Sequence, residues 1–367
     1  MKRCSRCILP NTIPNIQFDA NGVCNHCIEF ERNSKPFNFD SEKRIKRFVE
    51  IINATKAKSL KKGSKYDVLV PISGGRDSSY VAWKLATEYK MRVVCINYAN
   101  PYSSEQAIKN IETLVKAINA KLIRFSYPHR VHERSFAANL KAWSKKPDLG
   151  TLGLICLACK PMYMEFYKAA RKEKIDLIVD GANIFEVTTF KMEAQGGAGA
   201  KSLLSLKTFS KVFSKAAKNL EYIKFCNILP AIRTFLSLNG TTPFLKSRYP
   251  NIIKLGYFYF FPYNEMEINE TLRNIGWKKA DDNNSPWRFD CEVDSIKNYI
   301  YQRTISATEK DDLFSKYIRE GIMTREQAFK RLNEGEVNSE IVDKILGAIG
   351  LKSAQLDEAC AKLKGNK

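Results

Sequence analysis

The chain has 367 residues, of which 44% are hydrophobic and 27% charged, and its formal net charge is +21. This length predicts two or three structural units, because single domains generally hold on the order of 100–200 residues. A mean hydropathy of −0.34 and the lack of a long apolar run argue against a membrane-spanning protein. Ten cysteines in a chain that opens without an apolar leader favour thiols or metal ligands over disulfides, and we expect a cytoplasmic location.

The positive charge is clustered along the chain. Nine Lys and Arg residues and one acid lie between residues 43 and 65, and eleven with two acids lie between residues 190 and 260. Such clusters favour a polyanionic partner, for example a nucleotide, a nucleotide-sugar or RNA. A solvated, lysine-rich surface would give the same count, so charge alone does not decide between these partners.

Two cysteine pairs open the chain, Cys4-Ser-Arg-Cys7 and Cys24-Asn-His-Cys27, with sixteen residues between them. This spacing predicts a structural zinc site, because four thiolates close a tetrahedral shell and leave no open position. We expect a small metal-stapled lobe. A helix from Ser41 to about Ala54 and a basic linker from Lys56 to Lys65 should follow it.

From Tyr66 onward the pattern alternates between strands and helices. We expect strands over residues 67–72, 92–98, 121–126 and 175–179, and helices over residues 77–88, 105–118 and 160–173. This repetition predicts an α/β domain with a doubly wound parallel sheet that binds ligands at the carboxyl ends of its strands.

The second half is less regular. We expect an amphipathic helix over residues 203–220, a strand over residues 256–261, and short helices from residue 265 onward, one of them opened by Thr324. The first of these helices carries a basic stripe formed by Lys207, Lys211, Lys215 and Lys218. The predicted units are residues 1–62 (the cysteine lobe, helix and linker), residues 63–262 (the α/β domain) and residues 263–367 (a mostly helical region).

The segment Ser73-Gly74-Gly75-Arg76-Asp77-Ser78 joins the first predicted strand to the first helix of the α/β domain. Paired glycines let a phosphate approach the backbone, and the helix start offers unpaired N–H groups. Asp77 could hold a Mg²⁺ ion that shields the phosphate charge. This is not a Walker A loop, because no Gly-Lys-Ser/Thr ends it. An ordinary strand-to-helix turn is the weaker alternative.

This loop strongly resembles the Ser-Gly-Gly-x-Asp-Ser signature of the PP-loop ATP pyrophosphatases, which share a HUP-type, Rossmann-like fold. The resemblance implies that a substrate oxygen attacks the α-phosphate of ATP and that pyrophosphate leaves on the loop. It implies catalytic roles for Asp77 and Ser78. The residues it implies for ATP and pyrophosphate binding are Ser73, Gly74, Gly75, Arg76, Asp77, Ser78, Asn97, Asp180, Gly181 and Asn183. The last four end strands, where polar residues are also common without a ligand.

The cysteine lobe adds a second resemblance. Together with the residues around Phe18-Asp19-Ala20-Asn21-Gly22, it looks like the opening of the N-acetyl-sugar amidotransferases, in which a zinc-knuckle lobe precedes the PP-loop domain. The resemblance covers the chain from Cys4 to about Glu186. It implies ATP-dependent activation of the acetamido carbonyl of a nucleotide-linked sugar, addition of ammonia to give an acetamidino group, and a place in bacterial surface polysaccharide biosynthesis.

The source of ammonia is a separate question. Lys2 rather than a cysteine follows the first methionine, and no cysteine lies in a Gly-x-Cys-x-Gly turn. His129 and His132 are the histidines outside the cysteine lobe. We therefore expect a separate glutaminase subunit, which the family resemblance suggests is like that of imidazole-glycerol-phosphate synthase, and we expect no membrane partner.

Three further cysteines leave alternatives open. Cys156 and Cys159 precede a predicted helix and could be buried packing, a redox or metal pair, or, with Cys291, ligands of an iron–sulfur cluster as in some tRNA thiolases. The last reading supports an alternative function, a tRNA sulfur-transferase that uses the same adenylation. A nucleotide-binding scaffold without catalysis is a third reading.

The segment around residue 290 carries the substrate question. Trp287, Arg288 and Asp290 could line a substrate pocket, with Arg288 pairing to a phosphate or carboxylate. A core tryptophan and a surface ion pair are equally compatible with these residues.

Overall fold

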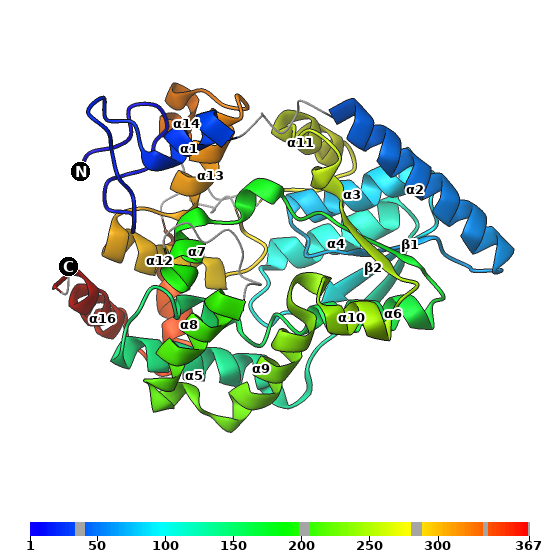
Figure 1. Ribbon diagram of the computed structural model, residues 1–367. Helices are drawn as coiled ribbons and strands as arrows, with labels where there is room; N and C mark the ends of the chain where they lie inside the picture. The colour runs from blue at the N-terminus through cyan, green and yellow to red at the C-terminus, as the bar shows by residue number, and fades with distance from the viewer. Residues whose placement is uncertain (34–40, 198–205, 280–287, 333–336, 366–367) are drawn as a thin grey trace.

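A computed structural model describes residues 1–33, 41–197, 206–279, 288–332 and 337–365. It contains a five-stranded parallel sheet in the order β3-β2-β1-β4-β5. Strands β1 and β2 of this sheet are labelled in the right half of Figure 1. The strands are β1 (Val68–Pro71), β2 (Val93–Tyr98), β3 (Lys121–Phe125), β4 (Leu177–Asp180) and β5 (Ile253–Gly256). The chain runs outward from β1 to β3 and then returns to β4 beside β1, so the strand order reverses at the β1–β4 pair. The doubly wound α/β fold expected from the sequence is confirmed.

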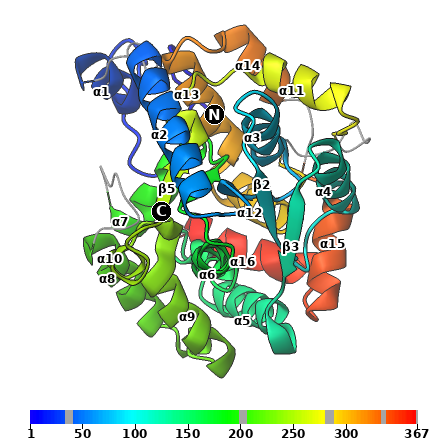
Figure 2. The ribbon, with the colours of Figure 1, turned by 90° about the vertical axis from the view of Figure 1, so that its right-hand side faces the viewer.

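Both faces of the sheet are covered, which explains why its central strands read as continuous apolar runs. Helices α2 (Ser41–Lys61), α3 (Arg76–Thr87), α4 (Glu105–Ala117) and α11 (Glu265–Asn274) lie on one side (Figure 2). On the other side, Phe166 and Tyr167 of α6 (Met162–Lys172) and Leu245 of α10 (Pro243–Arg248) pack against Leu69 and Ile178.

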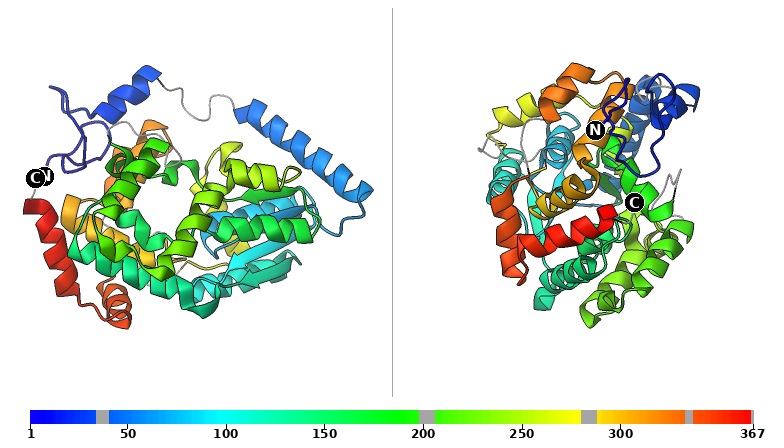
Figure 3. Two further views of the ribbon diagram at one scale, coloured as in Figure 1. Left: turned by 60° about the horizontal axis from the view of Figure 1, so that its bottom comes forward. Right: turned by 90° about the vertical axis from the view of Figure 1, so that its left-hand side faces the viewer.

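The cysteine lobe, which ends in α1 (Asn25–Asn33), packs against helices from the last third of the chain (Figure 3). Arg3 forms an ion pair with Asp311 at 2.6 Å, and the Ile8 N–H donates to Ser315 Oγ at 3.3 Å. These C-terminal helices are α12 (Val293–Ile305), α13 (Glu309–Arg319), α14 (Arg325–Leu332), α15 (Ser339–Ala348) and α16 (Ser353–Gly365). The mostly helical C-terminal region is thereby confirmed.

The chain between β3 and β5 contributes a further group of helices. It consists of α5 (Val131–Lys145), α7 (Thr189–Gly196), α8 (Leu206–Ala217) and α9 (Phe225–Ser237), together with short 3₁₀ turns. Helix α5 is not among the elements expected from the sequence, and its buried face includes the polar residues Ser135 and Asn139 beside Phe136, Leu140 and Trp143. This mixture of polar and apolar positions hides the helical period.

Two sequence predictions are wrong. The basic segment from Lys56 to Lys65 is not a linker for most of its length, because α2 continues to Lys61; lysine and alanine are good helix formers. The strand predicted over residues 256–261 ends at Gly256. The aromatic residues that follow turn as a 3₁₀ helix, which brings the Tyr257 ring to 5.6 Å from that of Phe48 in the core.

Candidate functional site

The loop between β1 and α3 requires glycine at one position for steric reasons. Gly74 has φ +82°, and a Cβ there would lie 2.0 Å from the carbonyl oxygen of Ala107 in α4. Its own carbonyl accepts hydrogen bonds from Trp277 Nε1 at 3.1 Å and from Asn110 Nδ2 at 3.3 Å. The loop is therefore pressed against α4 and held there by two side chains, neither of which carries a sequence signal for this role.

Across the point where the strand order reverses, the turn after β4 also comes close to the first turn of α3. A Cβ on Gly181 would lie 2.7 Å from Ser78 Cα and 2.8 Å from the Asp77 carbonyl oxygen. Helix α3 begins after Gly75 with no side chain capping its first N–H groups. The first turn of α3 and the turn after β4 thus enclose a helix N-terminus suited to an anion.

The serines of the loop line this N-terminus. Ser78 Oγ accepts from the Ser73 N–H at 3.3 Å, and the two hydroxyls lie 3.4 Å apart. These are long contacts at an exposed position, so both hydroxyl groups can exchange them for stronger bonds to a phosphate oxygen.

Arg76 and Asp77 are held by a network that leads away from the loop. Arg76 donates to Asp77 at 2.8 Å, to Glu265 at 2.5 Å and to the Tyr263 hydroxyl. The Tyr263 hydroxyl in turn donates to the same oxygen of Asp77 at 3.0 Å. Arg76 therefore anchors α3 to α11, and the nitrogen atoms that make these bonds are not offered to a ligand. No sequence pattern pointed to Tyr263 or Glu265.

The strand-end residues have mainly structural contacts. Asn97 is buried and donates to the carbonyl of Ile72 at 2.9 Å, which supports the entry to the loop. Asp180 is paired with Lys254 of β5, and Asn183 donates to the Tyr317 hydroxyl at 2.9 Å. All three lie at the carboxyl edge, as expected, although their polar groups already have protein partners.

The segment at residues 288–290 does reach the loop. A Cβ on Gly75 would lie 3.2 Å from Asp290 Oδ2, so this carboxylate stands directly over the glycine pair. Arg288 Nη1 lies 3.9 Å from Glu186 Oε2, just beyond β4. Trp287 lies outside the described residues. The expectation that Arg288 and Asp290 belong to the site is consistent with this geometry.

Glu186, just beyond β4, is an acid whose pKa is strongly perturbed. Burial raises its pKa to about 7, and the nearby carboxylates of Asp77 and Asp290 act in the same direction. Arg288 and Arg76 lower the pKa and offset part of that rise. A carboxyl group with a pKa near neutrality can both accept and release a proton at the working pH.

A buried ionic cluster continues the site away from the loop. Glu309, at the start of α13, is paired with Lys191 and lies 3.4 Å from Lys297 Nζ and 4.0 Å from Arg288 Nη1. The three cations hold the pKa of Glu309 well below its usual range despite its burial. Sequence reasoning missed Lys191, Lys297 and Glu309, because they come from three segments that only the fold brings together.

Magnesium fits this site only with help from a ligand. The carboxylates of Asp77 and Asp290 both influence the pKa of Glu186, so both lie in the region around Glu186. Within the described ranges, no group of three carboxylates brings its ligand oxygens within 4.8 Å of one another. Mg²⁺ ordinarily takes one or two carboxylates and completes its shell with phosphate and water oxygens, so the residues present fit a metal that arrives with a nucleotide.

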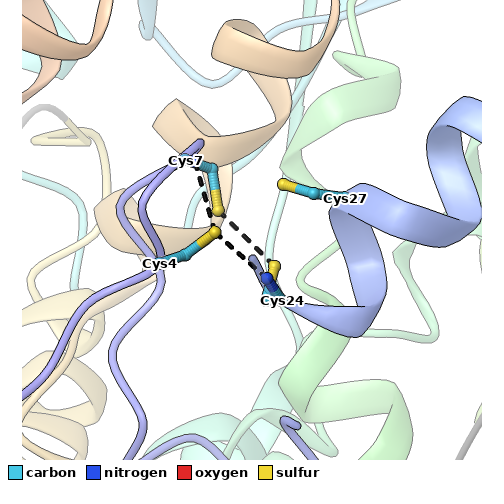
Figure 4. A group of neighbouring side chains, drawn as sticks. All are labelled: Cys4, Cys7, Cys24 and Cys27. Atoms are coloured by element: carbon cyan, nitrogen blue, oxygen red, sulfur yellow. Dashed lines mark hydrogen bonds between the residues drawn. The ribbon is translucent and has the colours of Figure 1, made fainter. Parts of the chain in front are cut away.

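The four cysteines of the N-terminal lobe come together as predicted (Figure 4). Their sulfur atoms lie within 4.8 Å of one another, and all four residues are buried. Cys4 Sγ accepts from the Cys24 N–H at 3.2 Å and from the Cys7 N–H at 3.4 Å. The donor set fits a metal ion with a closed shell of four sulfur ligands.

Three of the six remaining cysteines, Cys156, Cys159 and Cys291, share a region but no ligand geometry. Cys291 accepts from Asn100 Nδ2 at 3.2 Å, and burial raises its pKa to about 12. Cys156 and Cys159 lie near enough to influence that pKa. The sulfur atoms of these three described residues do not all lie within 4.8 Å of one another. A preformed second metal site at Cys156, Cys159 and Cys291 is therefore absent from this conformation.

The basic stripe of α8 is partly used within the protein. Lys211 Nζ donates to the carbonyl of Gly196 at 2.8 Å, and Lys215 pairs with Asp148 at 2.9 Å. The Lys207 side chain lies outside the described atoms, while Lys218 is exposed. The Lys211 contact caps the C-terminus of α7, and both contacts weaken the case for a continuous RNA-binding stripe.

A cavity of about 390 Å³ lies at the opposite edge of the sheet, beside the starts of β4 and β5. Its lining includes Lys62, Arg171, Asp176 and Arg248. In doubly wound folds the ligand site lies at the carboxyl ends of the strands, so we do not assign the chemistry to this cavity.

Comparison with known proteins supports a coarse assignment. Residues 63–195 match the family model described as thiamine biosynthesis protein (ThiI). An uncharacterized protein of Methanocaldococcus jannaschii is 29% identical over 122 residues, which are 33% of this chain and 41% of that protein. The match thus spans about two fifths of the relative's length. The family model matches the central region alone, which is therefore similar to that family, and the N-acetyl-sugar amidotransferase family is not confirmed.

Solved structures with some likeness belong to several enzymes. They include NMN synthetase from Francisella tularensis (13% identical, TM-score 0.28, 66% of this chain and 89% of that chain). Another is U34-tRNA thiolase NcsA from Methanococcus maripaludis with its 4Fe-4S cluster (13% identical, TM-score 0.34, 93% and 91%). A third is NH3-dependent NAD synthetase from Campylobacter jejuni (17% identical, TM-score 0.28, 58% and 93%). At these scores the likeness does not bear on activity.

Proposed function

We propose that this protein is a PP-loop ATP pyrophosphatase, and specifically an ATP-dependent, AMP-forming amidotransferase that converts the acetamido group of a nucleotide-linked sugar into an acetamidino group. The observation that carries the proposal is the glycine-lined loop at the uncapped start of α3, with Glu186 and Arg288 beside it. The loop suits pyrophosphate, and the adjacent acid suits the proton transfer that ammonia requires. The resemblance of the cysteine lobe to sugar amidotransferases supplies the substrate class.

The first step activates an amide that ammonia alone does not attack. The acetamido oxygen forms a bond to the α-phosphorus of ATP, the bond between the α-phosphorus and the bridging oxygen breaks, and pyrophosphate leaves. The N–H groups at the start of α3 and the hydroxyls of Ser73 and Ser78 would hold the departing charge. Asp77 and Asp290 would hold the Mg²⁺ that the nucleotide brings, and this ion would shield the phosphate charges.

In the second step ammonia adds to the carbon of the adenylated amide, and the carbon–oxygen bond breaks to release AMP. Glu186 takes a proton from the attacking nitrogen, a role that its pKa of about 7 suits. Arg288 is placed to orient Glu186 or an anionic group of the sugar. The amide oxygen ends on AMP, so atoms and charges balance without added water.

Oxygen labelling gives a direct test. With ATP, Mg²⁺, ammonium and a UDP-N-acetyl sugar labelled with ¹⁸O in the acetamido group, the label should appear in AMP. Asp77→Asn should abolish pyrophosphate release, whereas Asp343→Asn, at an exposed position on α15, should not change it. Formation of ADP, or unlabelled AMP, would refute the proposed route.

We also propose that ammonia comes from a separate glutaminase. The sequence offers no nucleophile in a glutaminase context, so the purified chain should use ammonium but not glutamine. Glutamine hydrolysis by the chain alone would contradict this division of labour.

We infer that the metal in the N-terminal lobe is structural zinc, because four buried thiolates leave it no open position.

A tRNA sulfur-transferase is the second candidate. It is favoured by Cys156 and Cys159, which lie near enough to Cys291 to influence its pKa, because three cysteines in one region are the ligand type of an iron–sulfur cluster. Anaerobically purified protein with bound iron that Cys156→Ser removes, together with salt-sensitive tRNA binding, would favour this function. Iron-free protein that labels AMP from the sugar would exclude it.

A further inference from the structure

Helix α9 (Phe225–Ser237) presents its polar side chains to the protein and its apolar side chains to the outside. Asn227 accepts from Ser135 Oγ and donates to Asn139 Oδ1, each at 2.7 Å. Thr234 Oγ1 donates to the carbonyl of Leu157 at 3.1 Å. These buried hydrogen bonds fix the rotation of the helix, so the outward position of the apolar residues is determined by the protein's own contacts.

The outward side of α9 and the turn before it form what we name the outer apolar face. Phe225 is 88% exposed, and the other members are each about half exposed or more. The face consists of Leu220, Ile223, Phe225, Ile228, Leu229 and Ile232. The helix lies at the periphery of the molecule (Figures 1 and 2). Large apolar side chains gathered on one protruding helix differ from the scattered exposure of ordinary surfaces and mark an interaction site.

The charge around this face selects the partner. Between residues 206 and 248 the chain has eight Lys and Arg residues and a single acid, Glu221. Lys218, Lys246 and Arg248 in this segment are exposed. A second copy of a chain with net charge +21 would bring like-charged rims together, whereas an anionic surface would neutralise them.

We propose that the outer apolar face inserts into the interface of a bilayer that contains anionic phospholipids. An apolar helix side that carries phenylalanine, leucine and isoleucine and belongs to a strongly cationic segment of the chain has the character of an interfacial helix. The proposal revises the sequence-based expectation of no membrane partner. It is compatible with the finding that none of the described helices combines the length and apolarity needed to cross a bilayer. It does not depend on the proposed reaction.

Vesicle flotation tests the proposal with the full-length chain. Binding is expected with vesicles of phosphatidylcholine and phosphatidylglycerol, and should be much weaker with phosphatidylcholine alone. Each lysine that approaches an anionic surface contributes about fivefold in affinity. The double variant Ile228→Gln/Ile232→Gln should reduce binding at least tenfold, because each buried isoleucine is worth about that factor or more.

A matched variant distinguishes insertion of this face from general surface adsorption. Met266→Gln, on α11, replaces a side chain that is 81% exposed outside this face and should leave binding unchanged. All variants should keep the thermal midpoint of the parent protein, because the replaced side chains face outward. No binding to anionic vesicles, or equal loss in both variants, would overturn the proposal. So would a dimer in solution that the double variant converts to monomers, because the face would then join two copies.

Discussion

Gly74→Ala tests whether the loop must press against α4. An alanine at φ +82° costs about 1–2 kcal/mol, because a Cβ is unfavourable in the left-handed region. The Cβ would also stand 2.0 Å from the carbonyl oxygen of Ala107, so the loop has to move. Movement would weaken the hydrogen bonds from Asn110 and Trp277 to the Gly74 carbonyl, each worth about 1 kcal/mol. We expect a total loss of about 2–4 kcal/mol in the free energy of unfolding.

Gly63→Ala is the matched control. Gly63 has φ +60°, but nothing lies within 4 Å of its would-be Cβ. This variant should therefore lose only the conformational part, about 1–2 kcal/mol, and keep its pyrophosphate release. Urea denaturation measures the loss of stability in both variants, and a pyrophosphate assay measures the function. If Gly74→Ala is no less stable than Gly63→Ala and equally active, the close approach of the loop to α4 is not required.

Three further predictions concern protons and metal. Under the proposed reaction, with free ammonia held constant, the rate should rise with pH through about 7 as Glu186 loses its proton. The Glu186→Gln variant should lack this inflection in the pH–rate profile and be roughly 100-fold slower. An unchanged profile would exclude Glu186 as the base. Burial lowers the pKa of His132 to about 4 from 6.5, so the folded state resists protonation. The free energy of unfolding should therefore be full above pH 6.5 and fall by up to about 3 kcal/mol toward pH 4. Urea denaturation of the His132→Gln variant should show a smaller fall. Cys24→Ser should remove the bound metal and lower the thermal midpoint, whereas Cys226→Ser should do neither; elemental analysis measures both the loss and the identity of the metal.

The elements that were predictable carry short-range signals. These signals lie within single segments: the apolar run of β1, the glycine pair after it, the helical spacing of apolar residues in α3, and the spacing of the four cysteines. In contrast, the ionic cluster of Glu309, Lys191 and Lys297 depends on where α7, α12 and α13 meet in space. No pattern within one segment encodes such a meeting.

Polar residues inside helices account for other misses. Helix α5 buries Ser135 and Asn139 because Asn227 of α9 supplies their hydrogen-bond partner, and this pairing is invisible in either segment alone. In the sequence, Glu186 is only a polar residue a few positions beyond the strand predicted over residues 175–179. Its raised pKa arises from burial and from Asp77 and Asp290, which lie about 100 residues away on either side in the sequence.

The ion pair between Arg3 and Asp311 joins residues 308 positions apart. A ribosome that adds about 5–20 residues each second needs on the order of 15–60 s to make the intervening chain. During that delay the four cysteines, which are local, can already have captured their metal, while the surface that Ser315 later covers stays in contact with solvent. The yield of folded protein is therefore expected to depend on translation speed, chaperones and metal supply during synthesis, when the N-terminal lobe has formed but the C-terminal helices have not.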